Sequence, residues 1–120
     1  MTSIIVHTAL LYLIQTLLPM IATKRISESA GERAGKAVHN LRESLPVFFV
    51  FAVLSVYFDV ESNIMIALVW LILRVAFVAV YVSGINTKPA QESGYEPQPL
   101  RSFLWLCSII CLIIMGVNLI

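Results

Sequence analysis

Apolar residues gather in four long runs that are separated by shorter polar segments. The runs cover residues 3–23, 45–58, 64–85 and 102–120. A helix needs roughly 17–25 predominantly apolar residues to cross the hydrocarbon core of a bilayer. Three runs reach that length alone, and the second continues upstream as an amphipathic stretch. The pattern therefore predicts an all-α, single-domain bundle of four membrane-spanning helices, at about residues 3–23, 31–58, 62–85 and 100–120.

The composition supports a membrane location. Hydrophobic residues make up 59% of the 120 residues and charged residues only 12%, and the mean hydropathy is +0.90. Soluble domains carry about 25% charged residues, and so short a chain cannot bury this much apolar surface in its own core. We expect lipid to cover it. No metal-ligand spacing, glycine-rich phosphate loop or sign of a nucleic-acid partner is present.

The basic residues are segregated along the chain. The segment between the third and fourth helices holds Lys88 and Arg101, whereas the one between the second and third holds Asp59 and Glu61 and no base. The segment after the first helix, with the start of the second, carries Lys24, Arg25, Arg33, Lys36 and Arg42. The positive-inside rule places the first and third connections in the cytoplasm and both termini outside.

One cation lies within a predicted helix. Arg74 is about 16 Å from the cytoplasmic end of the third helix, at 1.5 Å per residue. A charge at that depth costs at least ~2.5–3.5 kcal/mol unless it is paired. We expect Arg74 to face the bundle interior and to form an ion pair with Glu43, either as a purely structural contact or also as part of a ligand cavity.

Polar residues form two stripes on neighbouring helices. On the second helix they fall within an arc of about 80° at helical spacing, and on the third they share one face. The stripes consist of Arg33, Lys36, Asn40 and Glu43, and of Arg74, Phe77 and Tyr81. A solvated helix face would explain the first stripe, whereas a pocket for a charged ligand explains both.

Three sequence blocks carry a family resemblance. Residues 32–46, ERAGKAVHNLRESLP, are similar to the pattern E-R-x-x-R-A-x-x-N-x-x-E-x-x-P, Arg74 to Phe77 with Tyr81 form the second block, and residues 99–102 form the third. In this order the blocks resemble the membrane-associated proteins in eicosanoid and glutathione metabolism, the MAPEG family.

The resemblance implies a homotrimer with glutathione sites between adjacent subunits, open to the cytoplasmic half of the membrane. It implies a glutathione transferase, or a lipid hydroperoxide peroxidase, acting with glutathione as co-substrate on a lipophilic small molecule from the bilayer. Arg101 and Ser102 match the catalytic pair near the thiol. The residues that match glutathione-binding positions are Arg25 (or Lys24), Arg33, Lys36, Asn40, Glu43, Arg74 and Tyr81.

Departures from the family pattern keep a second interpretation open. Lys36 stands in place of an arginine, and a lysine lacks the planar fork that binds carboxylates in two places. Phe77 stands where several members have Tyr or His, and the linker before Arg101 is longer. Lys36 and Phe77 favour a non-catalytic membrane scaffold or partner-protein module on the same fold, whereas the longer linker bears on the choice of substrate. The short loops suggest a member of bacterial type, in the bacterial inner membrane.

Overall fold

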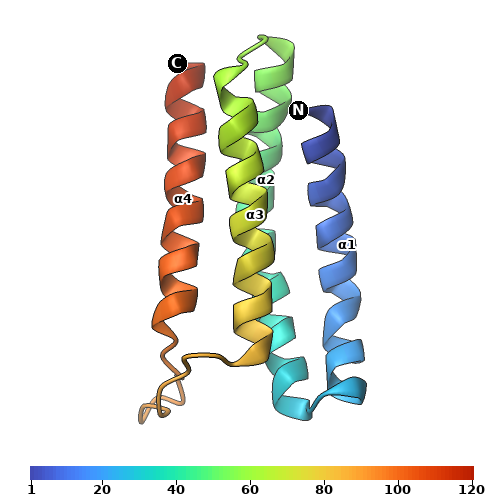
Figure 1. The fold of residues 1–120 in the computed structure, drawn as a ribbon, viewed down its shortest axis with the longest axis vertical. Coiled ribbons are helices and arrows are strands. Elements are labelled where there is room, and N and C mark those ends of the chain that lie inside the picture. The colour runs from blue at the N-terminus through green and yellow to red at the C-terminus, as the bar shows by residue number, and fades with distance from the viewer.

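The computed structural model describes residues 1–120 and contains four helices and no strand. They are α1 (Thr2–Arg25), α2 (Glu28–Tyr57), α3 (Ser62–Ser83) and α4 (Pro99–Leu119), drawn in Figure 1. Each is long and apolar enough to cross a membrane. The expected fold class, an all-α membrane bundle of four helices, is confirmed.

Local sequence explains where the helices begin and end. The Ser27 hydroxyl accepts a hydrogen bond from the Ala30 amide at 3.1 Å, so α2 begins at Glu28 rather than at the expected residue 31. A side-chain oxygen at this position satisfies one of the free amides of the first turn. At the end of α3, Gly84 adopts a φ of 73°, the left-handed conformation that terminates helices and that glycine adopts without strain.

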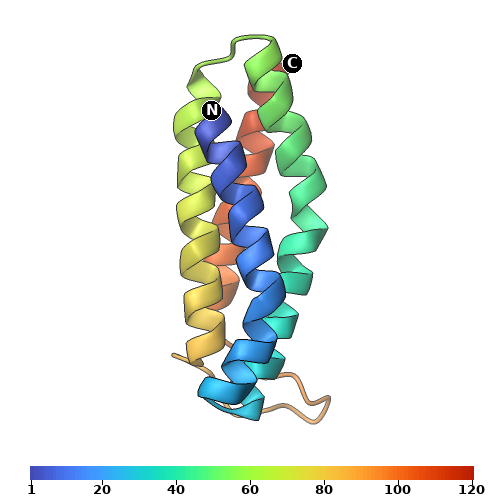
Figure 2. The ribbon, with the colours of Figure 1, turned by 90° about the vertical axis from the view of Figure 1, so that its right-hand side faces the viewer.

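The four helices run alternately up and down (Figures 1 and 2). Both termini and the α2–α3 turn lie at one end of the bundle, and the α1–α2 turn and the 84–98 segment lie at the other. Helix α1 packs mainly on α2, and α3 packs mainly on α4. The end with the 84–98 segment is therefore the end that carries the basic connections.

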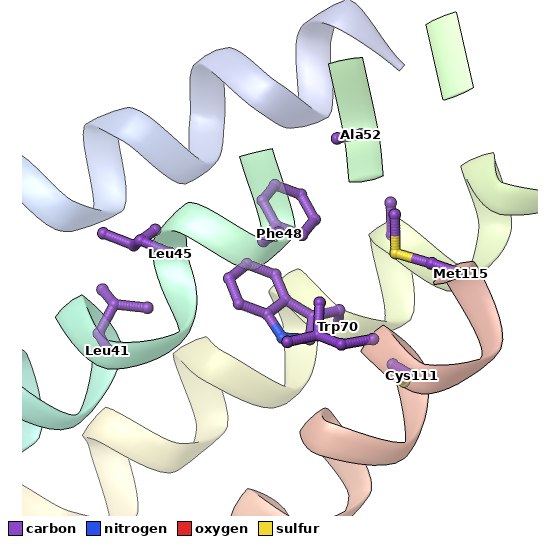
Figure 3. Packing of buried hydrophobic residues seen from close by; sticks show 9 residues of the cluster. Leu41, Leu45, Phe48, Ala52, Trp70, Cys111 and Met115 are labelled. Atoms are coloured by element: carbon purple, nitrogen blue, oxygen red, sulfur yellow. The ribbon is translucent and has the colours of Figure 1, made fainter. Parts of the chain in front are cut away.

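A stacked aromatic pair occupies the centre of the core. The rings of Phe48 and Trp70 lie 4.0 Å apart with an angle of 9° between their planes, as Figure 3 shows. Both side chains are fully buried, and Met115 and Cys111 of α4 close the cluster from the other side. Helices α2, α3 and α4 are thus held together by one continuous apolar cluster.

Small residues line the inner face of the first half of α2, where it packs on α1 and α3. Ala30, Ala34 and Ala37 are buried together with Ala22, and Gly31 lies against Thr23 so closely that an added methyl group would overlap the Thr23 hydroxyl. Small side chains let membrane helices approach closely and gain van der Waals contact. This packing fixes the polar half of α2 beside α1 and α3.

A polar network joins three helices near the end that carries the termini. The Asn63 amide nitrogen donates to the Ser55 hydroxyl at 2.9 Å and to the Met115 carbonyl at 3.1 Å. Its amide oxygen accepts from Asn118 at 2.9 Å. Because buried polar groups are costly when unpaired, this network favours one register of α2, α3 and α4.

The outer faces of α1, α3, α4 and the second half of α2 are mainly apolar and exposed. On α1 only Thr8, Gln15 and Ala22 are buried, at intervals of seven residues, so the greater part of the helix surface is left for contact with lipid or other protein. With four spans of this kind, the chain is an integral membrane protein.

Candidate functional site

A cavity of about 660 Å³ opens between α2, α3 and α4 at the basic end of the bundle. Its wall combines cationic, acidic and aromatic side chains. The lining residues from α2 are Glu32, Gly35, Lys36, His39, Asn40 and Glu43; the others are Phe77, Tyr81, Tyr95, Arg101, Ser102 and Trp105. Six of the nine residues expected to bind or activate glutathione therefore lie around one cavity: Lys36, Asn40, Glu43, Tyr81, Arg101 and Ser102.

Arg101 lies in the first turn of α4 and is only 9% exposed. Its guanidinium carbon is 4.5 Å from the centre of the Tyr81 ring and 5.5 Å from that of Tyr95. Its Nη2 also donates to the Tyr95 hydroxyl at 2.8 Å. Arg101 has no carboxylate within ion-pair distance, since the one carboxylate contact at that distance in the chain is between Glu43 and His39. Its positive charge is thus available to an anion in the cavity.

Ser102 follows Arg101 and is exposed in the same cavity. Both residues lie at the N-terminus of α4, where the helix dipole favours negative charge. The three features at this end of the cavity, a cation, a hydroxyl and a helix N-terminus, all stabilise an anion.

The expected ion pair between Arg74 and Glu43 is not formed within the chain. Arg74 is 1% exposed, and its Nη2 donates to the Asn40 side-chain oxygen at 2.8 Å. Its guanidinium also lies 4.4 Å from the centre of the Phe77 ring. Glu43 faces the open cavity instead, and its carboxylate is 3.3 Å from His39 Nε2.

Helix geometry explains this change of partner. Asn40 and Glu43 are three residues apart, so their directions from the helix axis differ by about 60° at 100° per residue. Asn40 points toward α3, whereas the Glu43 side chain is 66% exposed. Arg74 Nε and Nη1 have no hydrogen-bond partner, so Asn40 is the single polar partner of this buried cation.

Arg33 is placed beside the main cavity and not in it. Its Nε and Nη2 donate to the Val82 carbonyl at 3.2 and 2.9 Å. That carbonyl belongs to the last turn of α3, where no helical partner is available. Arg33 therefore ties α2 to the end of α3, and it also lines a neighbouring cavity of about 290 Å³ with Lys36 and Arg101.

Arg25 lies away from the site. It is the last residue of α1, is exposed, and does not line the main cavity. Helix α1 packs on the far side of α2 from α4, which separates Arg25 from Arg101 within one chain (Figure 1).

The structure adds five residues that the sequence analysis did not place in the site: Glu32, Gly35, His39, Tyr95 and Trp105. His39 precedes Asn40 in the motif. It is four residues from Glu43, and this spacing places the two side chains on the same face of the helix. Trp105 lies near the start of the fourth apolar run, where an aromatic residue ordinarily marks the membrane interface and not a ligand site. Tyr95 lies in an irregular segment without periodicity, so no local pattern marks it.

An apolar groove of about 690 Å³ continues from the cavity along α2 and α4. The cavity and the groove share Asn40, Glu43 and Trp105. The groove wall beyond them is mainly aliphatic, with Val47, Leu112 and residues near the end of α4. A polar compartment thus opens directly into an apolar one that lies along the membrane-spanning part of the bundle.

Comparison with protein families gives one match. The model of the MAPEG family matches residues 4–120, which is essentially the whole chain. No curated protein sequence and no solved structure matches the chain.

Proposed function

Since the chain belongs to the MAPEG family, we propose that it is a membrane-bound glutathione transferase that joins glutathione to a lipophilic electrophile from the bilayer. A peroxidase reaction on lipid hydroperoxides would use the same activated thiol. The observation that carries the proposal is the position of Arg101 and Ser102 in a cavity shared with Lys36, Asn40 and Glu43.

Glutathione and this cavity are complementary in charge. The peptide carries two carboxylates and one ammonium group, so it needs several cations and a carboxylate around it. Lys36 and Arg101 supply cations, and Glu43 supplies a carboxylate for the ammonium group. Asn40 and Tyr81 add neutral hydrogen-bonding groups on the same wall.

In the proposed reaction, Arg101 acts on the sulfur. Only the thiolate is strongly nucleophilic, and a nearby cation and a helix N-terminus both favour it over the thiol. Arg101 and the first turn of α4 supply these two features, and Ser102 would donate a hydrogen bond to the sulfur. The thiolate then attacks the electrophilic carbon, a C–S bond forms, and the displaced electron pair leaves with the leaving group or is protonated.

The apolar groove along α2 and α4 supports a lipophilic second substrate. It begins beside Trp105 at the cavity and follows the membrane-spanning part of the helices. A hydrophobic molecule would lie in the groove with its reactive end at the thiolate.

We further propose the homotrimer and the cytoplasmic orientation that the family resemblance and the distribution of basic residues favour, in a bacterial inner membrane. Exposed apolar faces on α2 and α4 are available for contact with other copies. In a trimer, Arg25 would serve a site shared with the neighbouring subunit. Arg33 and Arg74 do not line the main cavity and would support it indirectly, Arg33 through the end of α3 and Arg74 through Asn40.

Calorimetry with the purified protein in detergent tests the function. We expect glutathione to bind at millimolar concentration or below, and Lys36→Gln to weaken binding roughly tenfold, about 1.4 kcal/mol, through loss of a charge-assisted contact. Arg42→Gln is the matched control, because Arg42 is exposed on the same helix but does not line the cavity. Equal effects of the two changes would show only general electrostatic attraction.

Arg101→Ala separates catalysis from binding. The variant should bind glutathione but lose the ultraviolet absorbance of the bound thiolate. Loss of binding would assign Arg101 to anchoring instead.

The second candidate function is a non-catalytic membrane module on the same fold. The contact between Phe77 and Arg74 favours it, because an aromatic ring without a hydroxyl fills a position where a hydrogen-bonding group would serve a ligand. Absence of glutathione binding at millimolar concentration would support this function.

A further inference from the structure

Tyr95 is the one residue of the irregular segment between α3 and α4 that makes a side-chain hydrogen bond to a proposed catalytic residue. It is 49% exposed and lines both the main cavity and the smaller one beside it. The sequence analysis treated this segment as a surface linker, and no family motif covers it.

Hydrogen bonds of Gln98 fix the end of the segment that carries Tyr95, next to the start of α4. Gln98 is buried, and its Nε2 donates to the carbonyls of Val80 at 2.8 Å and Ile85 at 2.6 Å. These bonds join the start of α4 to the end of α3. Because Gln98 is only three residues after Tyr95, these hydrogen bonds keep Tyr95 close to Arg101.

Backbone hydrogen bonds also cross the segment. The Lys88 amide donates to the Pro97 carbonyl at 2.7 Å, and the Gln91 amide donates to the Tyr95 carbonyl at 2.9 Å. Because the chain folds back on itself in this way, the Tyr95 backbone has a defined position above the cavity.

The contacts of Tyr95 restrict the Arg101 guanidinium. The Tyr95 hydroxyl oxygen accepts from Nη2 at 2.8 Å, and the Tyr81 ring lies 4.5 Å from the guanidinium carbon. A long arginine side chain loses rotamer entropy when it is fixed. Two aromatic neighbours fix it before a ligand arrives, and neither of them neutralises its charge.

We propose that Tyr95 is a positioning residue of the transferase: its hydroxyl holds the Arg101 guanidinium against the cavity, at the place where the glutathione sulfur would bind. The inference rests on the proposed function and extends it to a residue outside the family motifs. A carboxylate in the place of Tyr95 would hold Arg101 equally well but would cancel its charge. A phenol holds the cation and leaves its charge available.

Tyr95→Phe tests the proposal, because it removes the hydroxyl and keeps the ring. A less restrained Arg101 stabilises the thiolate less, so the pKa of bound glutathione thiol should rise. We expect the pH profile of thiolate absorbance to move to higher pH, with a three- to tenfold lower thiolate fraction near neutral pH. The turnover number should fall by a similar factor, and KM for glutathione should stay within twofold.

Tyr57→Phe is the matched control, since Tyr57 is an exposed tyrosine at the opposite end of α2. It should leave the profile unchanged. An unmoved profile in Tyr95→Phe would overturn the positioning role, and so would a profile that moves to lower pH, which would mean that Tyr95 holds Arg101 away from the sulfur. Loss of glutathione binding in Tyr95→Phe would also overturn it, by making Tyr95 a ligand contact.

The wild-type protein separates failure of this inference from failure of the proposed function. A wild-type thiolate signal with no difference in Tyr95→Phe overturns only the role of Tyr95. A wild-type protein that gives no thiolate signal at saturating glutathione overturns both.

Discussion

Arg74 lies in the bundle interior, as its sequence position predicts, and within one chain its partner is Asn40. Its place within an apolar run predicts a side chain that faces the bundle interior, and it is 1% exposed. The predicted partner Glu43 is replaced by Asn40, a neutral acceptor at 2.8 Å. A buried cation with one neutral partner depends strongly on that partner, because two of its three nitrogens have none.

Asn40→Ala should therefore destabilise the protein without any ligand present. It leaves Arg74 buried without an acceptor, and an unsatisfied buried group costs about 1–3 kcal/mol, more when charged. Thermal unfolding in detergent should show a lower midpoint, and Arg74→Met in the same chain should recover part of the loss. Glu43→Gln should leave the midpoint of unfolding unchanged. A fall in the midpoint as large as that caused by Asn40→Ala would instead show that Glu43 pairs with Arg74.

At the scale of the helices, the position of α2 decides the shape of the site. Its first half is held against α1 by small residues and is tied to the end of α3 by Arg33. The opposite face of α2 borders the cavity and carries Lys36, Asn40 and Glu43. Close packing on one side of α2 thus determines which polar residues line the cavity on the other.

Two glycines of α2 give a matched test of this packing. A methyl group at Gly31 would overlap the Thr23 hydroxyl and lie 3.1 Å from the Pro19 carbonyl, whereas one at Gly35 would meet nothing within 4 Å. Gly31→Ala should cost about 1–3 kcal/mol through overpacking. Gly35→Ala should raise stability by about 0.5–1 kcal/mol, because glycine loses more backbone entropy in a helix.

Thermal unfolding of both variants in the same detergent is the measurement. Equal changes in the two midpoints would show that α1 and α2 are not packed closely at Gly31.

At the scale of the whole molecule, the bundle has two different ends. One end carries both termini and the α2–α3 turn, and the other carries the α1–α2 turn and the 84–98 segment (Figure 1). The first of these turns contains Asp59 and Glu61, whereas the cavity lies at the end with the basic connections. With four spans, both termini lie on one side of the membrane. The positive-inside rule then predicts that the cavity opens toward the cytoplasm.

Cysteine labelling checks this orientation. Glu28→Cys and Glu61→Cys place single thiols at exposed positions on opposite ends of the bundle, in a chain in which Cys107 and Cys111 are replaced by alanine. A membrane-impermeant maleimide added to intact bacterial cells should label the thiol at position 61 at once and the one at position 28 only after permeabilisation. The reverse pattern would place the cavity outside the cell.

The sequence by itself determined the number and type of the helices, the burial of Arg74 and most of the cavity wall. These follow from patterns within one element: apolar length, the spacing of polar residues along α2, and the motif at the start of α4. The tertiary structure decided which side chains from different elements meet. In the folded chain, Asn40 and not Glu43 contacts Arg74, and Arg33 donates to the Val82 carbonyl. Arg101 donates to the Tyr95 hydroxyl. Helical periodicity gives the direction of a side chain only within its own helix, whereas its partner depends on helix rotation and on the path of the 84–98 segment, which packing sets.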